Sequence, residues 1–378
     1  MKRKLYITRT VKLTCFLLAV ILTLSFLQAF LLRRFDQNSI RIEGYYLEEE
    51  NSLDVVLIGA SEVYTGFAAG KAYERYGFTS YPYATESITA DGVMLTLKEV
   101  LRTQTPQLVM IELNPYLYSH DKNEKHEGHI RKLLDNVPLN GNKIEYINEH
   151  TADEDKMEYL FPLIKYHGLW TEYPKEGRRM VSSIKQRIRG TSYLKGFRTT
   201  TTIAKPEYPI YNDKLAAENG TKPLNANLEA KLKNLMDYCK SQNVNVVFFR
   251  TPHLVYKNTY DRVKRANRAA EIISSYGYDC INLERDIDKF GIDSKTDFYN
   301  YDHMNVYGAV KATTYLGELI TRKYGVKPSK LEGEQKKRWD NAAKCFNQLY
   351  AYCDDLIKRG KNIRLEEDIN TLKVLNNY

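Results

Sequence analysis

The feature that most constrains this chain is an uncharged apolar segment near its N-terminus. Residues 13–32 read LTCFLLAVILTLSFLQAFLL and contain no charged side chain. As an α-helix, twenty residues extend about 30 Å, which is the thickness of a bilayer's hydrocarbon core. The segment therefore predicts a transmembrane helix at residues 13–32, preceded by a basic tail at residues 1–12.

A cleaved signal peptide and a buried core helix are the alternatives to a transmembrane anchor. Signal peptides usually have a shorter apolar region that ends in a small-x-small cleavage site. Ala29 is small, but Leu27 occupies the other position of that site. Five basic residues precede the segment and two follow it, which places the N-terminus in the cytoplasm by the positive-inside rule. We expect an uncleaved, single-pass signal anchor, with everything after about residue 35 extracytoplasmic.

The net charge of +9 is concentrated around this segment. Seven of the 56 Lys and Arg residues precede the first acidic residue, Asp36, and the other 49 nearly balance the 47 Asp and Glu residues. A nucleic-acid-binding domain carries a basic patch on its folded surface. The distribution therefore argues against a nucleic-acid partner.

The cysteines and histidines show no pattern that predicts a metal site. The five cysteines, at positions 15, 239, 280, 345 and 353, have no CxxC spacing. His126 and His129 are three residues apart, not the i, i+4 pair of a helical zinc site. We expect neither a metal nor a cofactor.

Five short apolar runs predict the strands of a buried sheet. Between them, apolar residues recur at helical spacing, as in Leu228, Leu232 and Leu235. Alternating strands and helices are typical of an α/β domain with a parallel sheet and helices on both faces. The runs are Leu53–Ile58, Phe78–Tyr83, Gln107–Leu113, Val244–Phe249 and Tyr278–Leu283.

The spacing of the runs divides the chain into three parts after the anchor. The α/β domain is expected at residues 50–325. About 130 residues separate its third and fourth strands, too many for a plain loop, so we expect a helical insertion at about residues 118–225. Residues 329–378 are predicted to form a tail of two charged helices, interrupted near residues 359–361.

A serine and a histidine at opposite ends of this domain could form a catalytic pair. Ser61 comes just after the first predicted strand, and Gly59 before it allows a sharp turn. His303 follows the last predicted strand, shortly before a helix that Asn305 is expected to cap. Loops after different parallel strands meet at one edge of the sheet, where ligands bind. A serine needs a base to become a nucleophile. Taken alone, Ser61 is also explained as a turn serine and His303 as a surface histidine. Their joint placement favours catalysis.

The surroundings of the two residues resemble a known family. The segments are Ile58–Glu62 (IGASE) and Asp302–Asn305 (DHMN), the latter followed by Gly308. They resemble the first and last blocks of membrane-anchored SGNH/GDSL-type hydrolases and acyltransferases, a group that includes the D-alanyl transfer protein of teichoic-acid modification and alginate-acetylation proteins. The resemblance implies a three-layer, flavodoxin-like parallel sheet, with Ser61 as nucleophile and His303 as general base.

The residue that orients His303 is left open by the sequence. The family's acid stands three residues before the histidine, where this chain has Asn300. A carboxylate orients the imidazole and stabilises its cation, whereas an asparagine can only orient it. Asp302 and Asn300 are the first two candidates, and Asp297 is the third.

The sequence also leaves open which groups would donate hydrogen bonds to an oxyanion. The family uses a backbone glycine after the second strand and an asparagine after the third. Here the second position reads Ala84–Ser87 (ATES) without a glycine, although any backbone N–H could serve. Asn114 follows the third strand, but Pro115 comes next, so turn formation explains it equally well. We take Gly59 and Asn114 as candidate oxyanion or substrate-binding residues.

The resemblance implies an extracytoplasmic, membrane-anchored serine esterase or O-acyltransferase. It would act on a cell-envelope glycan or polyol polymer through an acyl-serine, with an acyl donor, a glycan or polyol acceptor and a multi-spanning membrane O-acyltransferase as partners. The alternative is a catalytically inactive SGNH scaffold that binds or assembles an envelope-modification complex. Asn300 and the missing glycine favour that alternative, whereas Ser61 and His303 together disfavour it.

Overall fold

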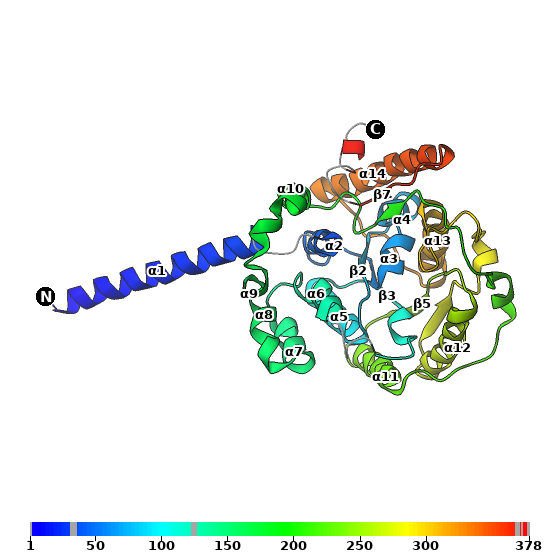
Figure 1. The fold of residues 1–378 in the computed structure, drawn as a ribbon, viewed down its shortest axis with the longest axis horizontal. Coiled ribbons are helices and arrows are strands. Elements are labelled where there is room, and N and C mark those ends of the chain that lie inside the picture. Colours follow the sequence, from blue (N-terminus) through cyan, green and yellow to red (C-terminus); the bar gives the residue numbers. More distant parts are fainter. Residues whose placement is uncertain (1, 31–35, 122–126, 367–370, 372, 376–378) are drawn as a thin grey trace.

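A long helix projects from the folded body at the N-terminus (Figure 1). The computed structural model describes residues 2–30, 36–121, 127–366, 371 and 373–375. Helix α1 (Lys2–Phe30) contains a stretch, Ile7–Leu27, that is long and apolar enough to cross a membrane and is not buried by the protein. This agrees with the predicted span, whose last two residues lie outside the described part. Its orientation stays a prediction.

The body is built on a five-stranded parallel sheet, so the predicted α/β class is confirmed. Each of the five apolar runs contributes one strand, and the three central strands are buried on both faces, as continuous apolar sequences require. The spatial order is β2-β1-β3-β5-β6. The strands are β1 (Val55–Gly59), β2 (Ser80–Ala84), β3 (Leu108–Glu112), β5 (Val246–Arg250) and β6 (Asp279–Asn282).

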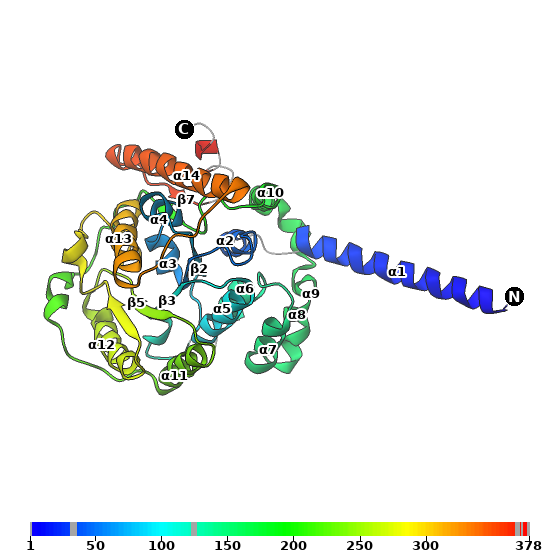
Figure 2. The same cartoon turned by 180° about the vertical axis from the view of Figure 1, so that it is seen from behind.

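Helices cover both faces of this sheet (Figures 1 and 2). On one face α4 (Ala69–Tyr76) packs against α13 (Val306–Glu318), and α14 (Gly333–Lys358) lies across α4. The other face carries α5 (Ala90–Thr103), α11 (Ala226–Ser241) and α12 (Tyr260–Ser275). The strand order changes direction at β1, because β2 lies on one side of it and β3 on the other. The loops after β1 and β3 therefore separate at the carboxyl edge and leave room for a site.

Local sequence sets where these helices begin. Asn305 accepts hydrogen bonds from the backbone N–H groups of Tyr307 (3.0 Å) and Gly308 (3.4 Å), the cap predicted for α13. Thr89 caps α5 in the same way, through the N–H of Gly92 at 3.0 Å. The helical spacing predicted in the 228–239 region corresponds to the buried face of α11.

The long segment between β3 and α11 forms several helices beside the end of α1 (Figure 1). They pack against α2 (Gln37–Tyr46) and α5. Two short strands, β4 (Thr199–Thr200) and β7 (Arg364–Leu365), pair antiparallel and join the end of this segment to the tail. The helices of the segment are α6 (Glu127–Leu134), α7 (Gly141–His150), α8 (Lys156–Leu160), α9 (Pro162–Tyr166) and α10 (Tyr173–Arg189).

The C-terminal tail and several short elements complete the secondary structure. The tail contains one long helix, α14, which ends at Lys358 and is followed by Gly360 in the left-handed region. Where a second tail helix is predicted, residues 364–365 form strand β7 instead, and most of residues 367–378 lie outside the described part. The short elements are α3 (Ser61–Gly66), a π-helical turn at Leu319–Lys323, and 3₁₀ turns at Asn114–Tyr116, Asp153–Asp155, Leu169–Glu172, Asn212–Ala217, Lys257–Thr259 and Ile287–Phe290.

Candidate active site

Ser61 stands where the central strand β1 gives way to a helix. The short helix α3 begins at Ser61 itself, and α4 follows from Ala69. The hydroxyl of Thr65 donates to the carbonyl oxygen of Ser61 at 2.9 Å and fixes this first turn. The nucleophile candidate therefore projects from a rigid strand–helix junction.

Gly59 has a packing role at this junction. A Cβ atom there would lie 2.6 Å from Cγ2 of Val63 and 2.7 Å from Cβ of Glu112. Its φ lies outside the left-handed region, so close approach of α3 and β3, and not a special turn, requires the glycine. Gly59 thus positions Ser61 and is no side-chain contact for a substrate.

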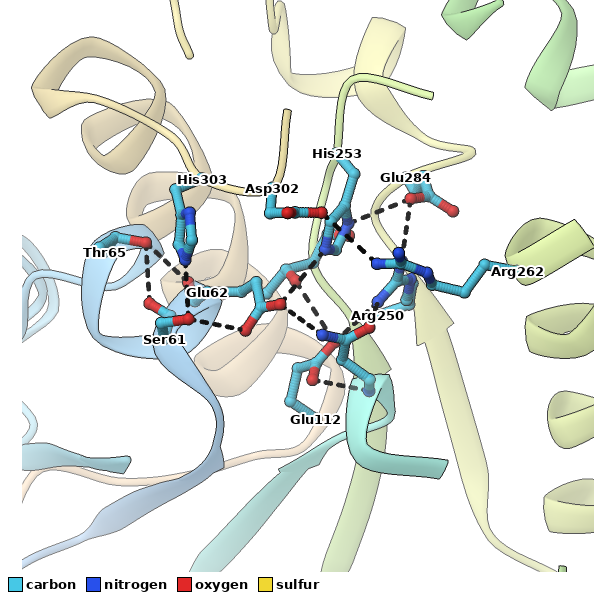
Figure 3. Close-up of polar contacts among 12 residues, drawn as sticks. Ser61, Glu62, Thr65, Glu112, Arg250, His253, Arg262, Glu284, Asp302 and His303 are labelled. Atoms are coloured by element: carbon cyan, nitrogen blue, oxygen red, sulfur yellow. Dashed lines mark hydrogen bonds and ion pairs between the residues drawn. The ribbon is translucent and has the colours of Figure 1, made fainter. Parts of the chain in front are cut away.

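His303 reaches Ser61 across the 242 residues that separate them (Figure 3). Nε2 of His303 lies 2.7 Å from Oγ of Ser61, within hydrogen-bond distance. The imidazole stacks on the ring of Tyr299, with centroids 5.2 Å apart and planes 15° apart. The backbone N–H of Tyr299 donates to the carbonyl oxygen of His303 at 3.0 Å, which closes the loop. The loop therefore holds the ring against the serine.

Asn300 orients the imidazole. Nδ1 of His303 lies 2.9 Å from Oδ1 of Asn300, and this amide oxygen can only accept. The same oxygen accepts the backbone N–H of Asp302 at 3.0 Å, which fixes the asparagine. With Nδ1 donating to Asn300, Nε2 has its lone pair directed at the Ser61 hydroxyl. This is the arrangement that proton transfer from Ser61 requires.

The two aspartates considered for the orienting role make other contacts. The Asp302 carboxylate lies 3.4 Å from Nη1 of Arg262. The Asp297 carboxylate is buried and lies 2.7 Å from Nζ of Lys311, one turn into α13. Of the three residues left open by the sequence, the geometry favours Asn300.

The protonation of His303 suits a base. Burial lowers its pKa, and the charges of Glu62 and Asp302 oppose that shift without cancelling it. The imidazole is therefore neutral at pH 7 and can accept a proton.

A buried cluster of charges lies directly beside the pair (Figure 3). Arg250, the last residue of β5, is at its centre: Nη1 lies 3.4 Å from Glu112 and Nη2 lies 3.3 Å from Glu284. Nη1 also donates to Oδ1 of Asn114 at 3.0 Å. All four side chains are essentially inaccessible to solvent.

His253 links this cluster to the neighbour of the serine. Its Nδ1 lies 3.1 Å from Glu284 and 2.8 Å from the carbonyl oxygen of Thr251. Its Nε2 lies 3.7 Å from Glu62, which is an ion-pair distance and longer than a hydrogen bond. Burial and the Arg250 charge disfavour protonation of His253, but the Glu284 and Glu62 carboxylates outweigh both and raise its pKa.

The pKa values of Glu112 and Glu62 are shifted in opposite directions. Burial raises the pKa of Glu112 to about 7, helped by the charge of Glu62 and opposed by Arg250. Burial also disfavours the charged form of Glu62, but the neighbouring His253 and His303 outweigh it, so the Glu62 pKa is lowered. Glu62 is thus the constant negative charge next to Ser61.

The oxyanion donors considered from sequence are engaged within the protein. The side-chain amide of Asn114 donates to Glu62 and, at 3.0 Å, to the hydroxyl of Tyr118. Two backbone N–H groups that follow β2 are used as well: Thr85 donates to the Gly59 carbonyl at 3.2 Å and Glu86 to the Asn38 side chain at 3.0 Å. Asn114 lies at the site, but in this structure it holds Glu62.

Three tyrosines gather on the loops next to His303. Tyr208 and Tyr256 stack with centroids 5.3 Å apart, and Tyr301 lies 4.7 Å from Tyr256. The backbone carbonyl of Tyr301 accepts the N–H of Leu254, which ties the His303 loop to the loop after β5. Tyr208 is 53% exposed, so this aromatic group presents a face to solvent beside the site.

Sequence reasoning missed most of the buried cluster. The available signal was a charged residue at the end of three of the five apolar runs: Glu112, Arg250 and Glu284. A charge buried at this position needs a partner, and neighbouring strands supply one.

No protein-family model matches this chain, and a search of curated proteins finds no match. Within the described residues, no group of three or more His, Cys, Asp or Glu side chains could hold a metal ion. The interpretation of the site therefore depends on its own geometry.

Proposed function

We propose that this protein is a membrane-anchored serine esterase or O-acyltransferase of SGNH type. The observation that carries the proposal is the chain of contacts from Ser61 Oγ to His303 Nε2 (2.7 Å) and from His303 Nδ1 to Asn300 (2.9 Å). Its position at the carboxyl edge of a sheet with strand order 2-1-3-4-5, the flavodoxin-like order, supports the same reading.

The geometry supports a two-step acyl transfer. Ser61 Oγ attacks the carbonyl carbon of an acyl ester while His303 Nε2 takes the hydroxyl proton. The protonated imidazole then gives this proton to the departing alcohol or thiol, which leaves an acyl-serine. In the second step His303 removes a proton from an acceptor hydroxyl or from water, the acceptor attacks the acyl-serine, and Ser61 regains its proton. Asn300 keeps the ring in one tautomer throughout.

The surroundings of the pair suggest where the acceptor binds. Tyrosine rings combine an apolar face with a polar hydroxyl, which suits the faces and hydroxyl groups of a sugar. The group formed by Tyr208, Tyr256 and Tyr301 adjoins the His303 loop and favours a glycan over a polyol acceptor. An N-terminal anchor would keep the site near envelope polymers and near a multi-spanning acyltransferase that supplies the acyl group.

One observation favours the alternative of a non-catalytic scaffold. The donors expected to stabilise an oxyanion, Asn114 and the backbone N–H groups of Thr85 and Glu86, all have internal acceptors. A binding protein could retain the Ser61–His303 contact without catalysis. The two functions differ in whether Ser61 reacts.

Labelling with a fluorophosphonate probe tests that difference, because the probe phosphonylates only activated serines. We expect full-length protein in detergent to be labelled, and Ser61→Ala and His303→Ala to lose the label. Matched controls are Ser274→Ala on α12 and His167→Ala, both exposed residues away from the site. Folded wild-type protein that stays unlabelled, or label that persists in Ser61→Ala, would contradict the proposal.

A further inference from the structure

The end of the anchor helix lies against the helical segment that follows β3. Helix α1 contacts α9, and a groove of about 830 Å³ lies between them. Ile21 and Leu24 line it from α1, and Leu160, Phe161 and Ile164 line it from α8 and α9. Apolar surface of the helix that can cross a membrane is therefore continuous with apolar surface of the folded body.

Large apolar side chains are exposed on this side of the body. Figures 1 and 2 both place α8 and α9 beside the end of α1. Met157, at the start of α8, is 54% exposed, and Phe161 and Ile164 are each 46% exposed. Soluble surfaces rarely leave such residues contiguous, and an exposed apolar patch marks a contact with a membrane or a partner.

The outer face of α10 adds basic residues to the same side. Its exposed residues Arg178, Val181, Lys185 and Ile188 follow each other at intervals of three, four and three residues, which is one helical stripe. Ile188 is 83% exposed. Alternating apolar and basic side chains suit the headgroup layer of a bilayer, where the apolar groups enter and the cations stay at the surface.

Hydrogen bonds fix this stripe relative to the anchor. On the inner face of α10, Ser183 donates to Glu43 at 2.6 Å and Gln186 donates to the carbonyl oxygen of Ile40 at 2.9 Å. Both acceptors belong to α2, the first helix described after α1. The position of the exposed stripe of α10 is therefore fixed by α2, the first helix described after the anchor helix.

The depth of the contact indicates what covers the surface. Ile21 and Leu24, which line the groove, lie inside the uncharged apolar segment at residues 13–32 and eight or more residues before its end at Leu32. The groove residues of α9 are thus at a depth that lipid occupies, and a soluble partner would not reach them.

We propose that α8, α9 and the outer face of α10 rest in the headgroup layer of the bilayer that α1 crosses. Lipid acyl chains cover Phe161, Ile164 and Ile188, and anionic headgroups pair with Arg178 and Lys185. The body is then held by a second contact and has a fixed tilt on the membrane. The proposal is independent of the chemistry at Ser61 and applies on whichever side of the membrane the body lies.

Site-specific fluorescence in vesicles tests this contact. Full-length protein with Cys15→Ser is reconstituted into phosphatidylcholine–phosphatidylglycerol vesicles, and a polarity-sensitive dye is attached at Phe161→Cys or Ile188→Cys. A control dye is placed at Ser274→Cys on α12, and protein without an introduced cysteine gives the background. We expect spin-labelled lipid to quench the dye at 161 and 188 at least about threefold more than at 274, and iodide to show the reverse order.

A charge-reversal variant tests the headgroup contact. Arg178→Glu with Lys185→Glu should reduce lipid quenching at position 188 in anionic vesicles, whereas Lys330→Glu with Lys337→Glu, also exposed, should not. Equal iodide access at 161, 188 and 274 would overturn the proposal, as would protein that does not float with the vesicles. Dyes exposed in pure lipid but shielded in native membranes would also overturn it, in favour of a protein partner.

Discussion

Two histidines lie at the same edge of the sheet, and their pKa values are shifted in opposite directions. His303 is half-buried, has a neutral amide on one nitrogen and a hydroxyl on the other, and burial lowers its pKa. His253 is fully buried, yet the Glu284 and Glu62 carboxylates beside it raise its pKa. Burial opposes the cation in both, and two carboxylates favour it in both; the outcome differs because those of His253 contact its ring directly.

The comparison separates catalysis from support. The neutral His303 can take the Ser61 proton. His253 lies between Glu284 and Glu62 and faces Glu62, which in turn accepts a hydrogen bond from Asn114. His253 therefore acts on Ser61 only through the position of Glu62, and loss of each histidine should have a different signature.

The largest effect should come from removing His303. His303→Ala should lower the rate of fluorophosphonate labelling by about 10²–10⁴-fold, the range of a positioned general base. Its free energy of unfolding should change by only about 1 kcal/mol, because the half-buried ring loses one stack on Tyr299 and two polar contacts. Labelling kinetics and urea unfolding of the same preparation measure the two quantities.

His253→Ala is the matched control for that result. Loss of the imidazole removes one of the two buried partners of Glu284 and of Glu62, which keep Arg250 and Asn114, so this variant should lose about 1–3 kcal/mol of stability. Two histidine variants with the same loss of labelling and the same stability would refute the division of roles.

The next effect concerns the centre of the supporting cluster. Arg250→Met keeps the volume but removes the cation shared by Glu112 and Glu284, leaving Glu284 with His253 alone, and should reduce the free energy of unfolding by about 3–5 kcal/mol. Arg268→Met, which breaks the exposed pair with Glu271, should cost at most about 1 kcal/mol. Urea unfolding measures both. Equal losses would mean that burial does not set the strength of the Arg250 pairs.

A smaller effect should appear in the pH dependence of stability. Because the folded-state pKa of Glu112 is raised to about 7, its protonated form favours the folded state, and this contribution is complete below pH 4.5 and is lost as pH rises through 7. Glu112→Gln keeps a neutral, hydrogen-bonding side chain. The stability of wild type relative to this variant should therefore fall between pH 4.5 and 7, by on the order of 2 kcal/mol. A constant difference across that range would show that Glu112 is ionised throughout.

The sheet was predictable from the sequence because its signal is local. Each strand is a run of apolar residues, and the cap at Asn305 is a residue type with one common use. The Ser61–His303 pair was predictable from topology, because loops after parallel strands meet at one edge. Which group orients His303 was not predictable, because the loop's hydrogen bonds decide between Asn300 and Asp302. The buried cluster was missed for the same reason: whether Arg250 meets Glu112 and Glu284 depends on strand order.

The smallest effect tests the residue that distinguishes His303 from His253. Asn300→Asp would place a carboxylate about 2.9 Å from Nδ1 of His303 and give this ring the kind of partner that His253 has. An adjacent negative charge favours the imidazolium, so the His303 pKa should rise by about 1, the lower end of the usual range because Asn300 is exposed. The acid limb of the labelling rate should shift to higher pH by the same amount. Its plateau should increase, because the carboxylate stabilises the imidazolium that forms during attack.

Asn300→Ala, which removes the acceptor without adding charge, should lower the plateau and leave the pKa of His303 below that in the aspartate variant. A pH profile that is identical in wild type, Asn300→Asp and Asn300→Ala would mean that His303 is not the base, and that the 2.7 Å contact with Ser61 is structural.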